Sequence, residues 1–389
     1  MDIERFKYSS SGRVVKSGRG DAAYWSFVPN PLPPNLVLGP RLINRLSRAD
    51  HSLGELAGLG RALPNPHLLI GPFMRKEAVL SSRIEGTESN VADLYAYEAG
   101  QLAFPGTKPP ESDVREVLNY VRAMEYGLER RKELPISLRL LRELHEHLMD
   151  GVRGGHATPG EFRRSQNWIG RPGCTLNEAT FVPPPVAEMN DALAAFEKYL
   201  HVENAYPPLV RLAFIHYQFE AIHPFLDGNG RIGRLLVSLL MVHWDLLPLP
   251  LLYLSAFFEK NRSDYYELLL GASKDGVWDE WLAFFLDGVT TQSKDAIGRA
   301  KALNDLQAEW RGRLARARAS ALLPKLADSL FTSPVITVPN AQRVLDVTYR
   351  SAKLNIGKLV DAGVLIEVGA AARNRIYVAH EILKIVQDD

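Results

Sequence analysis

The segment from His223 to Arg234 collects side chains of complementary chemistry and reads His-Pro-Phe-Leu-Asp-Gly-Asn-Gly-Arg-Ile-Gly-Arg. A histidine titrates near neutral pH, so His223 can accept a proton from an attacking hydroxyl group. Asp227 supplies a hard carboxylate oxygen, the type of ligand that Mg²⁺ prefers where it bridges two phosphates. These residue types predict a site that activates a hydroxyl group beside a metal-bound phosphate.

The second half of this segment is suited to binding phosphate. Gly228 and Gly230 flank Asn229 and free the backbone to adopt positive φ at the start of a helix, where N–H groups bind anions. Arg231 and Arg234 are three residues apart, so both guanidinium groups should emerge on nearly one face and bind neighbouring phosphates. A simple Gly-Asn-Gly turn between two bundle helices, flanked by solvated charges, would explain each residue singly but not the combination.

Two helices must position this loop. An apolar helix is predicted from Pro208 to Glu220, and it breaks at His223 because Pro224 disfavours helical geometry in the residue before it. His223 is therefore expected at an exposed bend. The apolar run from Ile232 to Trp244 predicts a second helix directly behind the loop. Hydrophobic periodicity predicts further bundle helices over residues 113–128, 137–149 and 186–200.

The predicted bundle is interrupted and preceded by less regular segments. Between Gly151 and Pro185, the stretches 167–169 and 180–182 favour strand and predict a β-hairpin flap. Prolines between residues 29 and 40 disfavour helix before about Leu42, so residues 2–66 are expected to form an extended arm. A helix with Pro72 in its first turn is then expected to end at Gly86.

The C-terminal part is predicted to be a winged helix-turn-helix. A helix from Ser351 to Ala362 should stop at Gly363, and two strands, 364–368 and 375–378, should follow. Residues 301–389 hold 13 Lys and Arg against 9 Asp and Glu. This modest excess predicts at most a weak, salt-dependent contact with DNA, and a winged helix can equally bind protein. The basic residues of the candidate recognition helix are Arg350, Lys353 and Lys358.

Composition sets the class of protein. The chain has 389 residues, 46% of them hydrophobic, which predicts two or three globular domains. A net charge of +1 gives no general attraction to nucleic acid or anionic membranes. The sequence shows no signal peptide, no membrane-spanning run and a single cysteine, Cys174, so we expect a cytoplasmic protein without a membrane partner.

The complete pattern His-Pro-Phe-x-Asp-Gly-Asn-Gly-Arg-x-x-Arg resembles the Fic motif, and the resemblance extends over about residues 70–290. It implies a mainly α protein: a Fic-type helical bundle with a β-hairpin flap, an extended N-terminal arm and a C-terminal winged-helix domain. It also implies a protein adenylyltransferase, which transfers AMP from ATP to a Ser, Thr or Tyr hydroxyl group of a target protein. The expected domains are 1–105 for the arm and inhibitory helix, 106–298 for the catalytic core and 299–389 for the linking helix and winged helix.

The resemblance also implies roles for individual residues. His223 would be the catalytic base, and Asp227 would bind Mg²⁺. An aromatic residue and a flap residue enclose adenine in Fic proteins, which points here to Tyr266 and Ile169, whereas Ser273 stands where relatives often carry asparagine. The residues implied to bind phosphate are Gly228, Asn229, Gly230, Arg231 and Arg234.

A second motif suggests regulation. The stretch Ser81-Ser82-Arg83-Ile84-Glu85-Gly86 resembles the inhibitory motif Ser/Thr-x-x-x-Glu-Gly/Asn of class II Fic proteins. This resemblance implies that Ser81 and Glu85 are inhibitory. An arginine and a carboxylate form a well-matched fork, so Glu85 would keep Arg234 from binding the γ-phosphate of ATP.

Several alternatives stay open at this point. In some Fic proteins the same glutamate positions a water molecule, so the chain could be a de-AMPylating hydrolase or a bifunctional enzyme. A nucleotide-sensing transcriptional regulator is a further reading, based on the C-terminal winged helix, and transfer of phosphate or phosphocholine is not excluded by the loop. Self-modification and a homodimer stay open as well. The target protein and the signal that releases Glu85 are not readable from the sequence.

Overall fold

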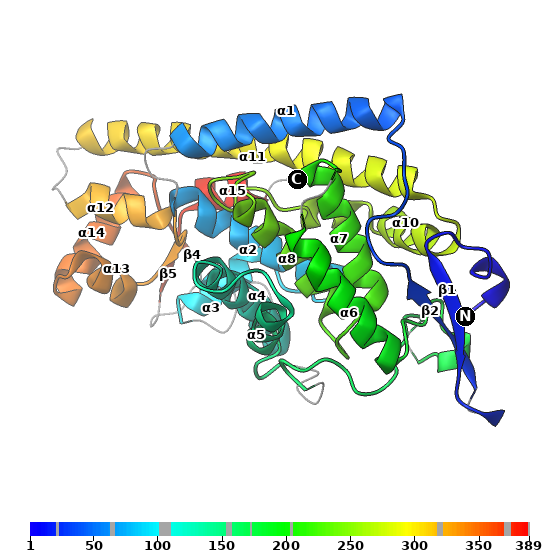
Figure 1. Cartoon of the computed structure of the whole chain (residues 1–389). Coiled ribbons are helices and arrows are strands. Elements are labelled where there is room, and N and C mark those ends of the chain that lie inside the picture. The colour runs from blue at the N-terminus through cyan, green and yellow to red at the C-terminus, as the bar shows by residue number, and fades with distance from the viewer. Residues whose placement is uncertain are drawn as a thin grey trace. The chain divides into compact units, whose positions relative to one another are not determined.

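The computed structural model describes residues 1–20, 23–62, 67–100, 110–152, 158–171, 173–202, 205–316, 322–368 and 375–387. This part of the chain is mainly helical and carries two small antiparallel sheets (Figure 1), which confirms the predicted fold class. The chain divides into two compact units. The first unit comprises residues 1–54, 122–246 and 254–292, and the second comprises residues 55–121, 247–253 and 293–389. The predicted domain boundaries after residues 105 and 298 stay predictions.

The N-terminal arm has more regular structure than its prolines suggested. After a short 3-10 helix, η1 (Ile3–Arg5), strands β1 (Gly12–Ser17) and β2 (Tyr24–Pro29) form an antiparallel hairpin. Helix α1 (Pro40–Ala62) then begins two residues before the expected start at Leu42. Proline is compatible with the first helical position, because the N–H that it lacks would have no partner there.

The hairpin packs against the flap. The predicted flap strands meet in one antiparallel bridge, in which Ile169 and Phe181 exchange backbone hydrogen bonds of 2.8 and 3.0 Å. The N–H of Phe27, in β2, donates to the carbonyl of Val182 at 2.8 Å. The ring of Phe27 lies 5.9 Å from that of Phe181, and Phe6 contacts both rings. The arm therefore supports the flap from the side opposite to Ile169.

The helical bundle of the first unit follows the predicted periodicity. Helix α7 spans Pro208–Ile222 and α8 spans Asn229–His243, and these two helices flank the loop of interest. Trp281 is fully buried, and its indole N–H donates to the carbonyl of Ala213 at 3.0 Å. The remaining elements with residues in this unit are α4 (Glu111–Arg130), α5 (Leu138–Leu148), η3 (Leu176–Glu178), α6 (Val186–His201), α9 (Ser255–Lys260), α10 (Arg262–Lys274) and α11 (Trp278–Arg316).

The second unit contains the candidate inhibitory helix, α2 (His67–Ile84). Pro72 lies inside α2 rather than in its first turn, so that expectation is corrected: the helix starts five residues earlier and loses one backbone hydrogen bond at the proline. Gly86 has a φ of 101°, a left-handed conformation that ends the helix as predicted. Asn90 then caps α3 (Val91–Glu98).

The rest of the second unit matches the predicted order of elements near the C-terminus. The two strands expected after Gly363 are confirmed and pair antiparallel as β4 (Ile366–Val368) and β5 (Ile376–Val378). The helix expected before them is α14 (Tyr349–Asp361), on which Arg350, Lys353 and Lys358 are exposed. The DNA contact of this helix stays a prediction, which gel shifts at two salt concentrations would test. The other elements are α12 (Leu322–Leu330), β3 (Val335–Ile336), α13 (Val338–Leu345) and α15 (His380–Gln387).

Within the described part of the chain, no helix is long and apolar enough to cross a membrane.

Candidate active site

The loop between α7 and α8 starts with an unusual backbone conformation at His223. This residue caps α7 with a φ of 49° and a ψ of 61°, in the left-handed region, and its N–H donates to the carbonyl of Phe219 at 3.0 Å. Pro224 disfavours the right-handed helical conformation, and the left-handed one turns the chain sharply. The side chain of His223 is half-buried, so the expected exposed bend is corrected to a partly enclosed one.

The hydrogen bond of the His223 ring defines its tautomer. Nδ1 lies 3.3 Å from the backbone carbonyl oxygen of Glu220. A carbonyl can only accept, so Nδ1 carries the proton and Nε2 keeps a lone pair. This is the arrangement that a general base requires.

Asp227 is suited to hold a metal ion. Its Oδ1 accepts the N–H of Gly228 at 2.6 Å and lies 3.6 Å from Nη2 of Arg231, and 52% of the side chain is exposed. The described residues contain no group of three or more His, Cys, Asp or Glu side chains that could bind a metal. Mg²⁺ commonly binds through one or two carboxylates together with substrate phosphates, and one exposed carboxylate beside a phosphate site fits that pattern.

Gly228 must be glycine for two reasons. Its φ of 77° is left-handed, and a Cβ atom there would lie 3.2 Å from Sδ of Met149 and 3.3 Å from Cδ2 of Leu148. Helix α8 starts at the next residue, so the first-turn N–H groups face the loop without partners inside the helix. This end of α8 can therefore bind an anion.

The side chain of Asn229 is used within the loop. Its Oδ1 accepts the N–H of Phe225 and its Nδ2 donates to the carbonyl of Phe225, both at 2.8 Å. The resemblance implied that Asn229 helps to hold the α-phosphate region. In this structure both polar atoms of its side chain bind the backbone of Phe225, and its role in phosphate binding stays a prediction.

The two arginines of the motif are held within the protein. Arg231 and Arg234 are each only 3% exposed, and Nη2 of Arg231 lies 3.8 Å from Sδ of Met149. Burial, and next the charge of Arg234, lower the pKa of His216 to about 3. The charge of Arg234 therefore acts inside the bundle, where low polarity strengthens its attraction for a phosphate.

Sequence reasoning missed His145, on α5. This histidine is fully buried, its Nδ1 accepts the N–H of Gly160 at 3.0 Å, and its Nε2 lies 3.1 Å from the carbonyl oxygen of Asp227. Its ring stacks on Phe225 with a centroid distance of 3.8 Å. Because Nδ1 accepts, Nε2 carries the proton and donates to Asp227. The available signal was a histidine on the apolar face of the helix predicted over 137–149.

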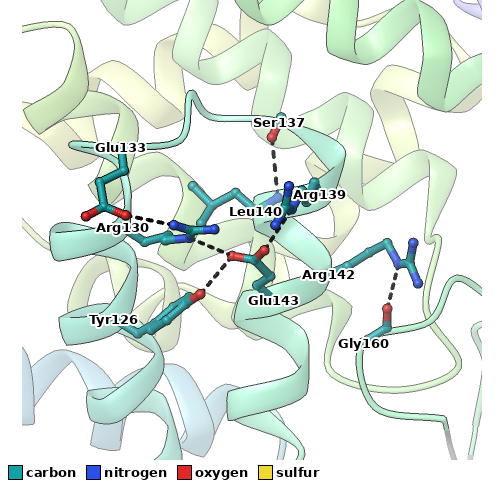
Figure 2. A network of polar contacts seen from close by, with 9 residues as sticks. All are labelled: Tyr126, Arg130, Glu133, Ser137, Arg139, Leu140, Arg142, Glu143 and Gly160. Atoms are coloured by element: carbon teal, nitrogen blue, oxygen red, sulfur yellow. Dashed lines mark hydrogen bonds and ion pairs between the residues drawn. The ribbon is translucent and has the colours of Figure 1, made fainter.

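A polar network fixes α5 to α4 (Figure 2). Glu143 accepts hydrogen bonds from Tyr126 at 2.8 Å, from Arg130 at 3.1 Å and from Arg139 at 3.0 Å. Burial raises the pKa of Glu143, but these hydrogen bonds outweigh it and lower the pKa to about 2. The network thus sets the position of the helix that carries His145.

Helix α5 also holds the peptide groups at Gly160, as Figure 2 shows in part. Nε of Arg142 donates to the carbonyl of Gly160 at 2.7 Å, and the N–H of Gly160 donates to His145. Gly160 has a φ of 76°, and a Cβ atom there would lie 3.3 Å from Cβ of Glu146. Glycine therefore allows the chain that leads to the flap to run close against α5.

The two candidate adenine contacts are not core residues. Tyr266, on α10, is 41% exposed, and Ile169, in the flap, is 37% exposed, whereas the neighbouring Tyr265 is buried. Ser273 is buried, and its hydroxyl group lies 2.9 Å from that of Tyr217. Tyr266 and Ile169 thus have surface available for a ligand, while Ser273 faces the interior.

The candidate inhibitory residues lie in the second unit. Ser81 is fully buried in α2. Glu85 follows the end of α2, is exposed, and donates its N–H to the carbonyl of Ser82 at 3.0 Å. The inhibitory role of both residues stays a prediction.

The buried histidines predict that acid destabilises the protein well before the carboxylates titrate. Burial lowers the pKa of His145 from 6.5 to about 4, so between these values the unfolded chain binds a proton that the folded chain does not. The stability that this provides is complete above pH 6.5 and is lost as the pH falls. At pH 5 the loss from His145 should be about 2 kcal/mol, at 1.36 kcal/mol per pH unit, and His216, whose pKa burial lowers to about 3, should add a similar loss.

Urea unfolding at pH 7 and pH 5 measures this loss. Glu143 makes no contribution in that interval, because its pKa lies below the ordinary value of 4.5 and its stabilisation is lost only below that pH. A His145→Gln variant should show a smaller loss between the two pH values. If the free energy of unfolding falls by the same amount in the variant as in the wild type, His145 does not cause this pH dependence.

Comparison with protein families gives two matches. Residues 43–129 match the family model described as Fic/DOC family N-terminal, and residues 135–241 match the one described as Fic/DOC family. The second match contains the whole loop and α5.

A protein named protein adenylyltransferase Fic from Drosophila grimshawi is 30% identical over 200 residues, which cover 50% of this chain and 37% of that protein. One of the same name from Culex quinquefasciatus is 29% identical over 231 residues, or 56% of this chain and 42% of that protein. The matched region thus spans less than half the length of these relatives.

Solved structures share the fold. A Fic family protein from Desulfovibrio desulfuricans G20 aligns with a TM-score of 0.57 and 18% identity, over 90% of this chain and 98% of that one. Fic-1 (residues 134–508) from C. elegans aligns with a TM-score of 0.53 and 21% identity, over 67% of this chain and 74% of that one.

Proposed function

Because this chain belongs to the Fic/DOC family, we propose that it transfers AMP from ATP to a Ser, Thr or Tyr hydroxyl group of a protein. The observation that carries the proposal is the loop from His223 to Arg234. It combines a histidine whose Nδ1 faces a backbone carbonyl, an exposed carboxylate and the glycine-rich start of a helix.

The reaction follows from these groups. Nε2 of His223 takes the proton of the attacking hydroxyl group, whose oxygen forms a bond to the α-phosphorus of ATP. The bond between that phosphorus and the bridging oxygen to the β-phosphate breaks, and pyrophosphate leaves with the negative charge. The products are AMP joined to the protein side chain through a phosphodiester, and pyrophosphate.

The remaining residues bind and orient ATP. The N–H groups at the start of α8 would bind the α-phosphate region, and Arg231 and Arg234 would bind the outer phosphates, where they compensate the charge of the leaving pyrophosphate. Both guanidinium groups are already desolvated, so little reorganisation is needed when charge develops. Tyr266 and Ile169 would enclose the adenine ring. Asp227 would hold Mg²⁺, and the bound ion would neutralise part of the phosphate charge.

The inhibitory motif at the end of α2, which contains Ser81 and Glu85, would restrain AMP transfer. Glu85 would bind Arg234, and the γ-phosphate would then lose its arginine, so that the α-phosphate is misaligned for attack by the hydroxyl group. Ser81 belongs to the same motif. Support for this regulation comes from the sequence pattern at the end of α2.

Labelled ATP tests the proposed reaction. Label in the α-phosphate should become acid-stable on protein, whereas label in the γ-phosphate should be released as pyrophosphate, and chelation of Mg²⁺ with EDTA should stop the transfer. Transfer of the γ-label instead would assign the protein to phosphate transfer. Absence of both labels from protein, with the Glu85→Gly variant as enzyme, would overturn the proposal.

A further inference from the structure

Three consecutive carbonyl groups of the active-site loop are held by one segment of the chain. We call residues 163–167 the pre-flap segment, because they lead directly to Ile169 in the flap. The carbonyl of His223 accepts from Nε of Arg163 at 3.0 Å and from Nδ2 of Asn167 at 3.3 Å. The carbonyl of Pro224 accepts the N–H of Arg163 at 2.9 Å, and that of Phe225 accepts Nδ2 of Asn167 at 2.8 Å.

Arg163 is an unusual residue for such a contact. It is 1% exposed, and its other hydrogen bonds go to the carbonyls of Ser165 and Pro184. Within the part of the chain that the structure describes, it forms no ion pair. Burial lowers its pKa to about 10, which still leaves it charged at neutral pH. A buried charge is costly unless it is fully hydrogen-bonded, and here backbone carbonyls meet that requirement.

His223 needs external support for its conformation. The left-handed region is unfavourable for a residue with a Cβ atom, and the bond from Nδ1 to the carbonyl of Glu220 is long at 3.3 Å. A rotation of the peptide between His223 and Pro224 would move the imidazole and its Nε2. The hydrogen bonds from Arg163 and Asn167 to the His223 carbonyl oppose that rotation.

We infer that Arg163 is a positioning residue for His223. Asn167 assists it by donating to the same carbonyl group, that of His223. Through this contact the pre-flap segment couples the flap to the base: a displacement of the flap changes the orientation of Nε2. The kinetic part of this inference rests on the proposed function, but the orientation of the His223 ring does not.

The kinetic test uses Arg163→Lys and Arg163→Met, with Arg164→Met as the matched control. Arg164 is adjacent, its side chain is 85% exposed, and it pairs only with Glu161 in the described structure. Arg163→Met should lower kcat about hundredfold, the cost of a misplacement of about 1 Å, while KM for ATP stays within about twofold in both Arg163 variants. Arg163→Lys should recover part of kcat, and Arg164→Met should match the wild type.

A calorimetric ATP titration separates positioning from loss of folded protein. The variants should still bind one ATP per chain with wild-type affinity. If the ATP stoichiometry falls in parallel with kcat, Arg163 is merely structural and the inference is overturned. Should Arg163→Met not fold, Asn167→Leu replaces it. Among the residues that the structure describes, Oδ1 of Asn167 is buried and has no hydrogen-bond partner, so leucine removes the donors and little else.

The ring nitrogens of His223 give a readout that is independent of activity. In ¹⁵N-histidine NMR spectra, the wild type and Arg164→Met should show His223 with a protonated Nδ1, and Asn167→Leu or Arg163→Met should show a mixture of tautomers. An unchanged tautomer in both variants would overturn the inference. If the protein transfers no AMP at all, the proposed function fails but this spectrum still decides the positioning role.

Discussion

Replacing His223 with alanine is expected to abolish AMP transfer, with a fall of about a hundred- to ten-thousandfold, while ATP still binds. The change removes the Nε2 lone pair that accepts the hydroxyl proton. It leaves the first turn of α8, Arg231, Arg234 and Asp227 in place, so the affinity for ATP should change little. Transfer of α-labelled AMP and a calorimetric ATP titration measure the two quantities.

The backbone at His223 calls for a second variant. Alanine is poorly suited to the left-handed conformation at φ 49°, so a loss of activity could come from a reshaped loop. Asparagine adopts this conformation more readily but cannot act as a base near neutral pH. His223→Asn should therefore be as inactive as His223→Ala. Wild-type transfer in either variant would remove His223 from the mechanism.

Glu85→Gly should raise the rate of AMP transfer about ten- to hundredfold. A hydrogen bond between charged groups contributes about 1.5–3 kcal/mol, and each 1.4 kcal/mol corresponds to a tenfold change in rate. Removal of the carboxylate would leave Arg234 available for the γ-phosphate. The change is otherwise mild, because Glu85 is exposed and follows the end of α2, where Gly86 already has a left-handed backbone. Initial rates of self-modification with α-labelled ATP measure the effect.

A double variant tests whether the restraint acts through the arginine. Glu85→Gly combined with Arg234→Ala should lose the gain, because relief of inhibition needs that guanidinium group. If the double variant stays activated, Glu85 restrains the enzyme by another route. If Glu85→Gly instead leaves the initial rate unchanged and slows the loss of AMP from pre-modified protein, the chain removes AMP rather than adding it, and Glu85 serves hydrolysis.

The helical bundle was predictable because its signals are local. Apolar residues repeat at helical spacing in α5, α6 and α8, and glycines such as Gly86 and Gly363 mark where helices end. The N-terminal hairpin was less accessible. Strand β2 is held through Phe27 by contacts with Val182 and Phe181, which are more than a hundred residues away in the sequence. Such pairings leave no pattern in the arm itself.

The active-site loop was predictable for the same reason, since its groups are consecutive in the chain. The residues that hold this loop in place were not predictable from the sequence. His145 and Arg163 act through backbone carbonyls, and a carbonyl group is common to every residue type. The use of the Asn229 side chain within the loop was also hidden, because asparagine can bind either phosphate or backbone. Sequence therefore indicated which residues we propose to do chemistry, and structure showed which residues hold them in place.

The most direct test of the central claim is the intact mass of the Glu85→Gly protein after incubation with ATP and Mg²⁺, with His223→Ala in the same background as control. The Glu85→Gly protein should gain the mass of one or more AMP groups, and the control should stay unmodified. A gain equal to phosphate, an unchanged mass, or equal modification of the control would contradict the claim that this loop transfers AMP to protein.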